Sequence, residues 1–237
     1  MPALGWRAAV GASAVIVAAL VLALGVGWLA SLRSSTSRYV VSKPLHRVEL
    51  VVTSGDALIV GTQASTLEVR RTDHYAFGHE AIEHRSLRGG VLRIDSSCPK
   101  VVVGSCSASY ELAVPETVSL SIRTTGGNVR LTGFRGTAAI VTGTGNVDVE
   151  AYCGFDLAAT TRSGRVRIAS ACTPQHLEVR TRTGDATALV PPGSRYRISA
   201  ISGVGQPRIS GVVRDRSAPF TIDMHSGSGR LTIGAGL

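Results

Sequence analysis

The sequence of 237 residues has few aromatic residues, 5% of the total, and no block of Lys and Arg interleaved with them. Proteins that bind single strands without sequence preference combine a basic channel with aromatic stacking platforms, so nucleic acid is not expected as a partner. The formal net charge of +9 comes almost wholly from Arg residues scattered singly along the chain. We interpret them as a solvated basic face, with binding of anionic cell-envelope polymers as the alternative.

The sequence also lacks the common motifs of catalysis and metal binding. It has no Gly-x-Ser-x-Gly elbow, and its glycine strings do not open helices that could hold a phosphate. His79 and His84 are five residues apart, whereas a zincin helix needs four. We therefore expect no enzymatic activity, no cofactor and no metal. The carboxylates considered for a glycan-cleaving site are Asp148, Glu150, Asp156, Glu178 and Asp185.

One long apolar run is present near the N-terminus. Residues 8–30 carry no charge, lie between Arg7 and Arg33, and have Trp6 and Trp28 near their ends. Such a run is long enough to cross a bilayer as a helix. The sequence predicts a cytoplasmic segment over 1–7, an uncleaved transmembrane anchor over 8–30 and a flexible, Ser-rich linker over 31–47. A cleaved signal peptide is the alternative, although Trp28 makes a poor cleavage site.

An internal repeat occupies most of the remaining chain. Alternating segments of similar sequence surround Gly127, Gly145, Gly164 and Gly184, which are 18, 19 and 20 residues apart. Further copies surround Gly55 and Gly229. A glycine between two period-2 segments is typical of a sharp corner that needs positive φ. We therefore predict these six glycines as the turns of the repeat.

The copies align in columns of like residues. The first inward column is Leu120, Ala138, Leu157 and Leu177, and a polar one is Thr124, Thr142, Thr161 and Thr181. We expect the threonine hydroxyls to bond one another between copies. The predicted fold class is all-β, a β-solenoid of roughly 20-residue coils over residues 48–237, preceded by one transmembrane helix. The repeat is interrupted between Thr62 and Pro115, where the His-rich stretch 72–88 is expected to form a hairpin excursion of unknown role.

Four cysteines are present. Cys153 and Cys172 each lie eight residues after a repeat glycine, so they occupy the same position in adjacent coils, within the distance that a disulfide spans. Cys98 and Cys106 then remain as a local pair. Two disulfides indicate an oxidising compartment. Although the positive residues after the apolar run favour the opposite orientation, we expect the domain to be extracytoplasmic on a single-pass membrane protein.

The repeated unit supports a resemblance. Residues 110–129 read YELAVPETVSLSIRTTGGNV, and related units recur at 142–147, 161–166, 181–186 and 225–231. This pattern resembles the bacterial "putative adhesin" domain family of unknown function, over roughly residues 48–237. The resemblance implies a repetitive all-β fold at the cell envelope and assigns no binding residues. The disulfides and the His-rich insertion depart from the family pattern.

Three functions are compared on this basis. The favoured one is a membrane-anchored, adhesin-like binding or scaffold module without catalysis, with anionic envelope polymers or another envelope protein as partner. The alternatives are an accessory or sensory ectodomain of an envelope-stress system and a polysaccharide-processing β-helix enzyme. Unpaired strands at the ends of the solenoid are expected to permit self-association.

Overall fold

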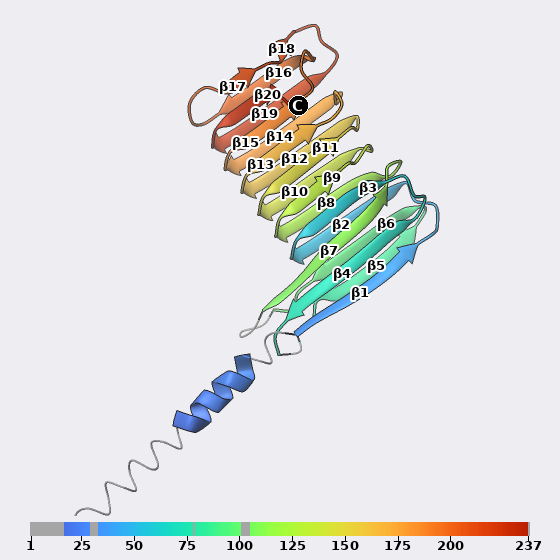
Figure 1. Cartoon of the computed structure of the whole chain (residues 1–237), viewed down its shortest axis with the longest axis vertical. Helices are drawn as coiled ribbons and strands as arrows, with labels where there is room; N and C mark the ends of the chain where they lie inside the picture. Colours follow the sequence, from blue (N-terminus) through green and yellow to red (C-terminus); the bar gives the residue numbers. More distant parts are fainter. Residues whose placement is uncertain (1–16, 29–32, 78, 101–104, 237) are drawn as a thin grey trace, which may run out of the picture.

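The computed structural model describes residues 17–28, 33–77, 79–100 and 105–236. Strands dominate these residues and form two ten-stranded sheets, with most strands lying across the long axis of the stack (Figure 1). The inward side chains of the two sheets form one hydrophobic core, which includes Leu50, Ile122, Ile168 and Ile233.

The first sheet combines antiparallel strands at one end with parallel strands through the rest. β1 pairs antiparallel with β4, and β4 pairs antiparallel with β7. The spatial order of the strands is β1 (Arg33–Val41), β4 (Leu67–Tyr75), β7 (Cys106–Pro115), β3 (Ala57–Thr62), β9 (Val129–Thr132), β11 (Val147–Tyr152), β13 (Val166–Ser170), β15 (Ala186–Val190), β20 (Leu231–Ala235) and β17 (Arg208–Ser210).

The second sheet is parallel except for one hairpin, in which β5 and β6 are joined through Gly89 and Gly90, both with positive φ. Its spatial order is β18 (Val213–Arg214), β16 (Arg195–Ser202), β19 (Thr221–Ser228), β14 (His176–Thr183), β12 (Asp156–Ser163), β10 (Ala138–Thr144), β8 (Ser119–Gly126), β2 (Arg47–Ser54), β6 (Val91–Ser97) and β5 (Ile82–Arg88).

Each repeat contributes one strand to each sheet. In the unit around Gly145, β10 lies in the second sheet, the chain turns at the glycine, and β11 lies in the first. Neighbouring units are in register, so that Ala138 is aligned with both Leu120 and Leu157, and Leu157 with Leu177. The predicted columns of like side chains are confirmed.

The predicted fold class is nevertheless wrong. The described residues form two separate, mixed sheets that are mostly parallel, and not a closed β-solenoid. A solenoid needs each coil to follow the previous one in space, and the chain departs from this at both ends. Strands β4 to β7 follow β3 in the chain but lie outside β2 and β3, at the edges of the sheets, so β3 has β7 and β9 as neighbours. Strands β16 to β18 precede β19 and β20 in the chain but lie outside them, so β20 has β15 and β17 as neighbours.

The predicted transmembrane helix also needs correction. The described helix covers residues 17–28, and no helix in the described part of the chain is long and apolar enough to cross a membrane. Residues 8–16 and 29–30 of the predicted span lie outside the described residues.

Two expectations about irregular segments change as well. Most of the expected flexible linker, residues 33–41, is strand β1. The His-rich stretch 72–88 is divided between β4 of the first sheet and β5 of the second, so it connects the two sheets. The predicted hairpin lies one step further along the chain, between β5 and β6, because the paired glycines 89 and 90 form the tight turn.

Candidate functional site

The turn glycines form a column along one side of the stack. Gly55, Gly127, Gly145, Gly164 and Gly184 have φ between +133° and +149°. A Cβ built on Gly145 would lie 2.0 Å from the carbonyl oxygen of Gly127, and Gly164 and Gly229 show the same distance to the preceding glycine. At the five corners from Gly55 to Gly184, glycine is therefore required both for its backbone conformation and for the close approach of the neighbouring unit, whereas at Gly229 only the close approach requires it.

Two hydroxyls of the threonine column bond to this glycine column, whereas those of Thr124 and Thr181 have no hydrogen-bond partner among the described residues. Thr142 Oγ1 donates to the carbonyl of Gly127 at 3.3 Å, and Thr161 Oγ1 donates to that of Gly145 at 3.2 Å. The hydroxyls therefore do not bond one another as expected. The backbone carbonyl of the preceding corner accepts these two bonds instead.

A ladder of side-chain oxygens follows the glycines. Asp56 Oδ1 accepts from the backbone N–H of Asn128 at 2.7 Å, and Asn128 Oδ1 accepts from that of Asn146 at 3.0 Å. Asp185 Oδ1 accepts from the N–H of Arg230 at 2.8 Å, and this bond holds the pKa of Asp185 below its usual range. The Asp or Asn that follows four of the corners thus helps to set the register of the next unit, a role that the alternation pattern did not reveal.

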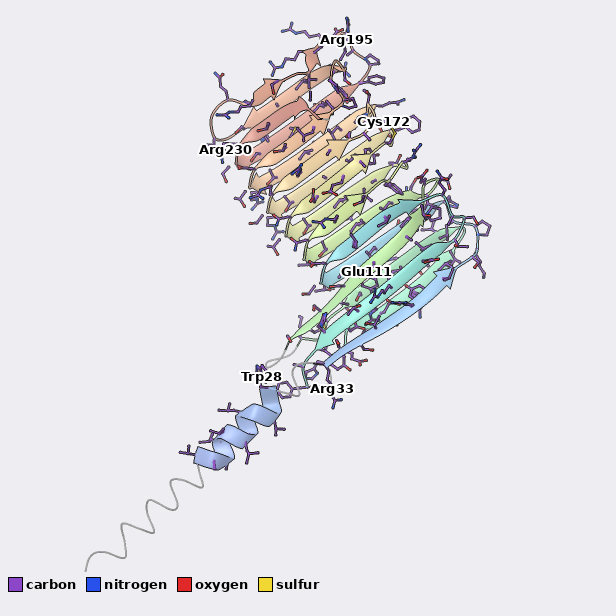
Figure 2. All side chains as sticks on the ribbon, in the orientation of Figure 1. Trp28, Arg33, Glu111, Cys172, Arg195 and Arg230 are labelled. Carbon is purple, nitrogen blue, oxygen red and sulfur yellow. A yellow bond between two sulfur atoms is a disulfide. The ribbon has the colours of Figure 1, made fainter. Side chains whose placement is uncertain are left out.

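Both predicted disulfides are present. Cys153 and Cys172 are joined with their Cα atoms 4.7 Å apart, and Cys98 and Cys106 with theirs 5.7 Å apart. Cys153 follows β11 and Cys172 follows β13, and these strands are neighbours in the first sheet. Cys172 lies on the side of the stack opposite Arg230, which follows a turn glycine (Figure 2). The disulfide therefore links adjacent units on the side away from the glycine column.

Removal of this link is expected to lower stability. The double variant Cys153→Ser/Cys172→Ser opens a loop with a sequence separation of 19 residues. Loop-closure entropy of the unfolded chain then predicts a loss of about 3 kcal/mol in the free energy of unfolding. Urea unfolding of the oxidised wild type and the variant measures the difference. A loss below about 1 kcal/mol would show that the link does not constrain the unfolded chain as this entropy model requires.

The outer face of the second sheet carries the most distinctive surface feature, a shallow groove of about 760 Å³ near the glycine column. A row of residues crosses it from strand to strand, and the floor contains Gly143 and Gly227. The groove residues with charged or titratable side chains are Arg162, Arg180, Arg182 and His225. We call this feature the arginine groove.

Two arginines of the groove lie directly beside each other. Thr161 pairs with Thr181 and Ser163 with Thr183, so Arg162 on β12 is aligned with Arg182 on β14. Both side chains are exposed, and neither has an acidic partner among the described residues. Like charges directly opposite on neighbouring strands are unfavourable. The pair therefore contributes no stability to the fold and leaves two guanidinium groups available on one surface.

The neighbouring arginine is different, because Arg180 is paired with Glu178 of its own strand. His225 lies beside Arg180 on the next strand, β19. Threonine hydroxyls complete the surface, with Thr125, Thr144 and Thr160 along the groove. The groove thus offers cationic donors and neutral hydroxyls around a glycine floor.

The carboxylates considered for catalysis do not gather into a site. Asp148 is 3.7 Å from Arg130, Asp185 is 3.3 Å from Arg230, and Glu178 pairs with Arg180. The register aligns Asp156 with His176, which places Glu178 two positions away from it. Among the described residues no cluster of three or more His, Cys, Asp or Glu side chains could hold a metal ion.

A buried ionic cluster at the β1 end of the stack was missed at the sequence level. Arg71 lies 2.7 Å from Asp73 and 3.6 Å from Glu83, and these three side chains are only 7–12% exposed. Tyr110 donates to Glu83 at 2.7 Å, and Arg85 pairs with Glu83 at 2.8 Å. The residues come from both sheets, so the cluster joins β4 and β7 to β5 across the interior.

Burial shifts the titration of the tyrosines and of the aspartate in this region. Desolvation, reinforced by Glu83, raises the pKa of Tyr39 to about 12. The pKa of Tyr110 is raised further, first by burial. Burial also raises the pKa of Asp73, while the hydrogen bond from Arg71 opposes the rise. Tyr39 in turn lies under the Arg85 guanidinium, 4.1 Å from its ring centre. Arg71, Asp73 and Glu83 are thus largely shielded from solvent, whereas the Arg85 side chain, which covers them, is half exposed.

The fold and surface define the protein as a mostly β protein of stacked, parallel repeat units with a cationic groove. No family model matches the sequence, and no curated protein does either. Solved structures do show similarity. A putative cell adhesion protein from Clostridium sporogenes aligns with a TM-score of 0.51 at 12% identity, covering 86% of this chain and 100% of that one.

Two further structures are less similar. A putative adhesin from Bacteroides fragilis aligns with a TM-score of 0.44 at 15% identity, covering 87% of this chain and 99% of that one. A putative lipid binding protein from Parabacteroides distasonis aligns with a TM-score of 0.36 at 10% identity, covering 86% and 97%. At such identities the Clostridium sporogenes match concerns the fold alone, and at that level it supports the resemblance to putative adhesins.

Proposed function

We propose that the chain is a non-catalytic, extracytoplasmic binding module whose arginine groove holds an anionic polymer of the cell envelope. The observation that carries this proposal is the side-by-side placement of Arg162 and Arg182 without acidic partners, above a glycine floor. Guanidinium groups bind carboxylate and phosphate through paired hydrogen bonds. A polymer with repeated anionic groups would neutralise both arginines at once, which relieves their mutual repulsion.

The location rests on the disulfides. Two disulfides with no free cysteine in the described residues fit an oxidising compartment, because cytosolic thiols are kept reduced. The pairing of candidate carboxylates with arginines supports the non-catalytic part of the proposal, since a glycan-cleaving site needs two carboxylates facing one bond. The coverage of 86% of this chain by the putative cell adhesion protein's fold is in keeping with a binding role.

The double variant Arg162→Ser/Arg182→Ser tests the groove. We expect it to bind polygalacturonate and polyphosphate about tenfold or more weakly than the wild type, because each lost charge-assisted contact is worth about 1 kcal/mol or more. Isothermal titration at low and high salt measures the affinity, with dextran as the neutral polymer. Wild-type binding should weaken with salt.

The matched control is Arg88→Ser/Arg216→Ser, which removes the same charge from exposed positions outside the groove. It should retain most of the affinity. Equal losses in both double variants would show that only net charge matters, and absence of binding by the wild type to either polymer would overturn the proposal.

A further inference from the structure

The two sheets end in four edge strands, and these edges differ in how well they are protected. The first sheet ends at β1 and β17, and the second ends at β18 and β5. Edge strands present backbone N–H and C=O groups that can pair with another chain. Natural proteins blunt such edges with short strands or charged side chains.

Three of the four edges have such protection. β17 contains three residues and β18 only two. β5 contains seven residues but carries Glu83, His84, Arg85 and Arg88. None of these three edges offers a long row of backbone groups with few charged side chains.

β1 is the exception. It contains nine residues, RSSTSRYVV, and pairs with β4 along its whole length, from Arg33 with Tyr75 to Val41 with Leu67, without a register shift. No described strand lies on its other side. Seven of its nine residues are exposed, and Arg33 and Arg38 are its only charges. Figure 1 shows β1 along the outer border of the sheet, and Figure 2 places Arg33 at its start.

We propose that β1 pairs antiparallel with β1 of a second copy of this chain, about a two-fold axis at Ser37. Among the described edges, β1 is the only one with nine backbone positions and no more than two charged side chains, so the same strand of a second copy can meet it over its whole length. Because both copies would use the same strand, the interface would have two-fold symmetry, and the assembly would contain two copies and no more. The first sheet would then continue through both copies.

The register follows from the faces and charges of β1. A two-fold axis perpendicular to the sheet keeps each side chain on its own face, so a residue pairs with one of the same parity. Centring on Ser37 places Arg38 opposite Thr36 of the second copy and Arg33 opposite Val41. No two arginines are then directly opposed, whereas centring on Arg38 would oppose them.

Sedimentation velocity of the full chain in a neutral detergent tests this proposal. We expect a reversible dimer with a dissociation constant on the order of 10 µM, because one strand pair is a small interface. Ser37→Lys and Ser37→Asp should each be monomeric, since each would oppose two like charges at the axis. An equimolar mixture of the two variants should restore the dimer through a Lys–Asp pair.

The matched control is Ser199→Lys on β16, an exposed serine away from β1, which should dimerise like the wild type. A wild-type chain that stays monomeric at every concentration overturns the proposal. So does a Ser37→Lys variant that associates as the wild type does, since another surface is then responsible. Polymer binding by the arginine groove, on the second sheet, is independent of either result.

Discussion

Replacement of Gly145 by alanine is expected to lower the free energy of unfolding by about 4 kcal/mol and the Tm by about 10 °C. Gly145 has φ +146°, which L side chains rarely adopt, and the new Cβ would lie 2.0 Å from the carbonyl oxygen of Gly127. The corner must move to relieve this contact, which breaks the bond that Thr161 donates to the Gly145 carbonyl. Thermal and urea unfolding followed by circular dichroism measure both quantities.

Gly133→Ala is the matched control. Gly133 also has positive φ, +63°, but nothing lies within 4 Å of the added Cβ. We expect a loss of about 1 kcal/mol, from backbone strain alone. Equal losses in the two variants would mean that close stacking of the corners is not what requires glycine at position 145.

Replacement of Arg71 by methionine is expected to destabilise the protein by about 3–5 kcal/mol, because it leaves Asp73 and Glu83 buried without a central cation. Arg70→Met is the control on the neighbouring residue. Arg70 lies 3.3 Å from Glu111 in an exposed pair, with side chains 44% and 53% accessible, so its loss should change stability by less than about 1 kcal/mol. Urea unfolding at neutral pH compares the two variants.

The effect of Arg71→Met should depend on pH. Burial raises the pKa of Asp73, and the Arg71 hydrogen bond opposes this rise, so the variant raises the pKa further. A carboxyl whose pKa is higher in the folded than in the unfolded chain favours folding when protonated and disfavours it as pH rises through the folded pKa. The deficit of the variant should therefore be largest at neutral pH and shrink below about pH 4. A deficit that does not change with pH would contradict this account.

Much of the repeating part of the fold could be predicted from the sequence. The period-2 alternation and the spacing of Gly127, Gly145, Gly164 and Gly184 identify strands, corners and register, since a shift by one residue would move the apolar columns to the outer face. The position of Cys153 and Cys172 within adjacent units predicts their pairing for the same reason. Local pattern and tertiary structure agree wherever a unit packs only on copies of itself.

The ends of the stack could not be predicted in this way. β1 reads as a polar linker because both of its faces are largely exposed, so its sequence has no alternation, and only its backbone pairing with β4 makes it a strand. The sequence 72–88 reads as aperiodic because its inward positions include Asp73 and Glu83, which are buried in ionic contacts made by residues distant in the chain. Such pairing partners are not visible in a local pattern.

The arginine groove was visible only as scattered charge. Arg162 and Arg182 are 20 positions apart in sequence, and their adjacency depends on the register of β12 with β14. The columns of inward residues already imply that register. The sequence could therefore also have shown which outward residues lie side by side on neighbouring strands. Which acidic side chains pair with which arginines, and hence which arginines stay unpaired, could be identified only from the positions of the side chains.

The corner geometry has a consequence for how such a chain can vary in length. Each corner glycine presents its carbonyl to the next unit, and the next unit presents an equivalent corner in turn. A duplicated or deleted unit between two corners, such as residues 128–145, would restore the same contacts on both sides of the junction. Change by whole units would then lengthen or shorten the molecule in increments of one strand spacing, about 4.8 Å, while the specialised ends stay intact.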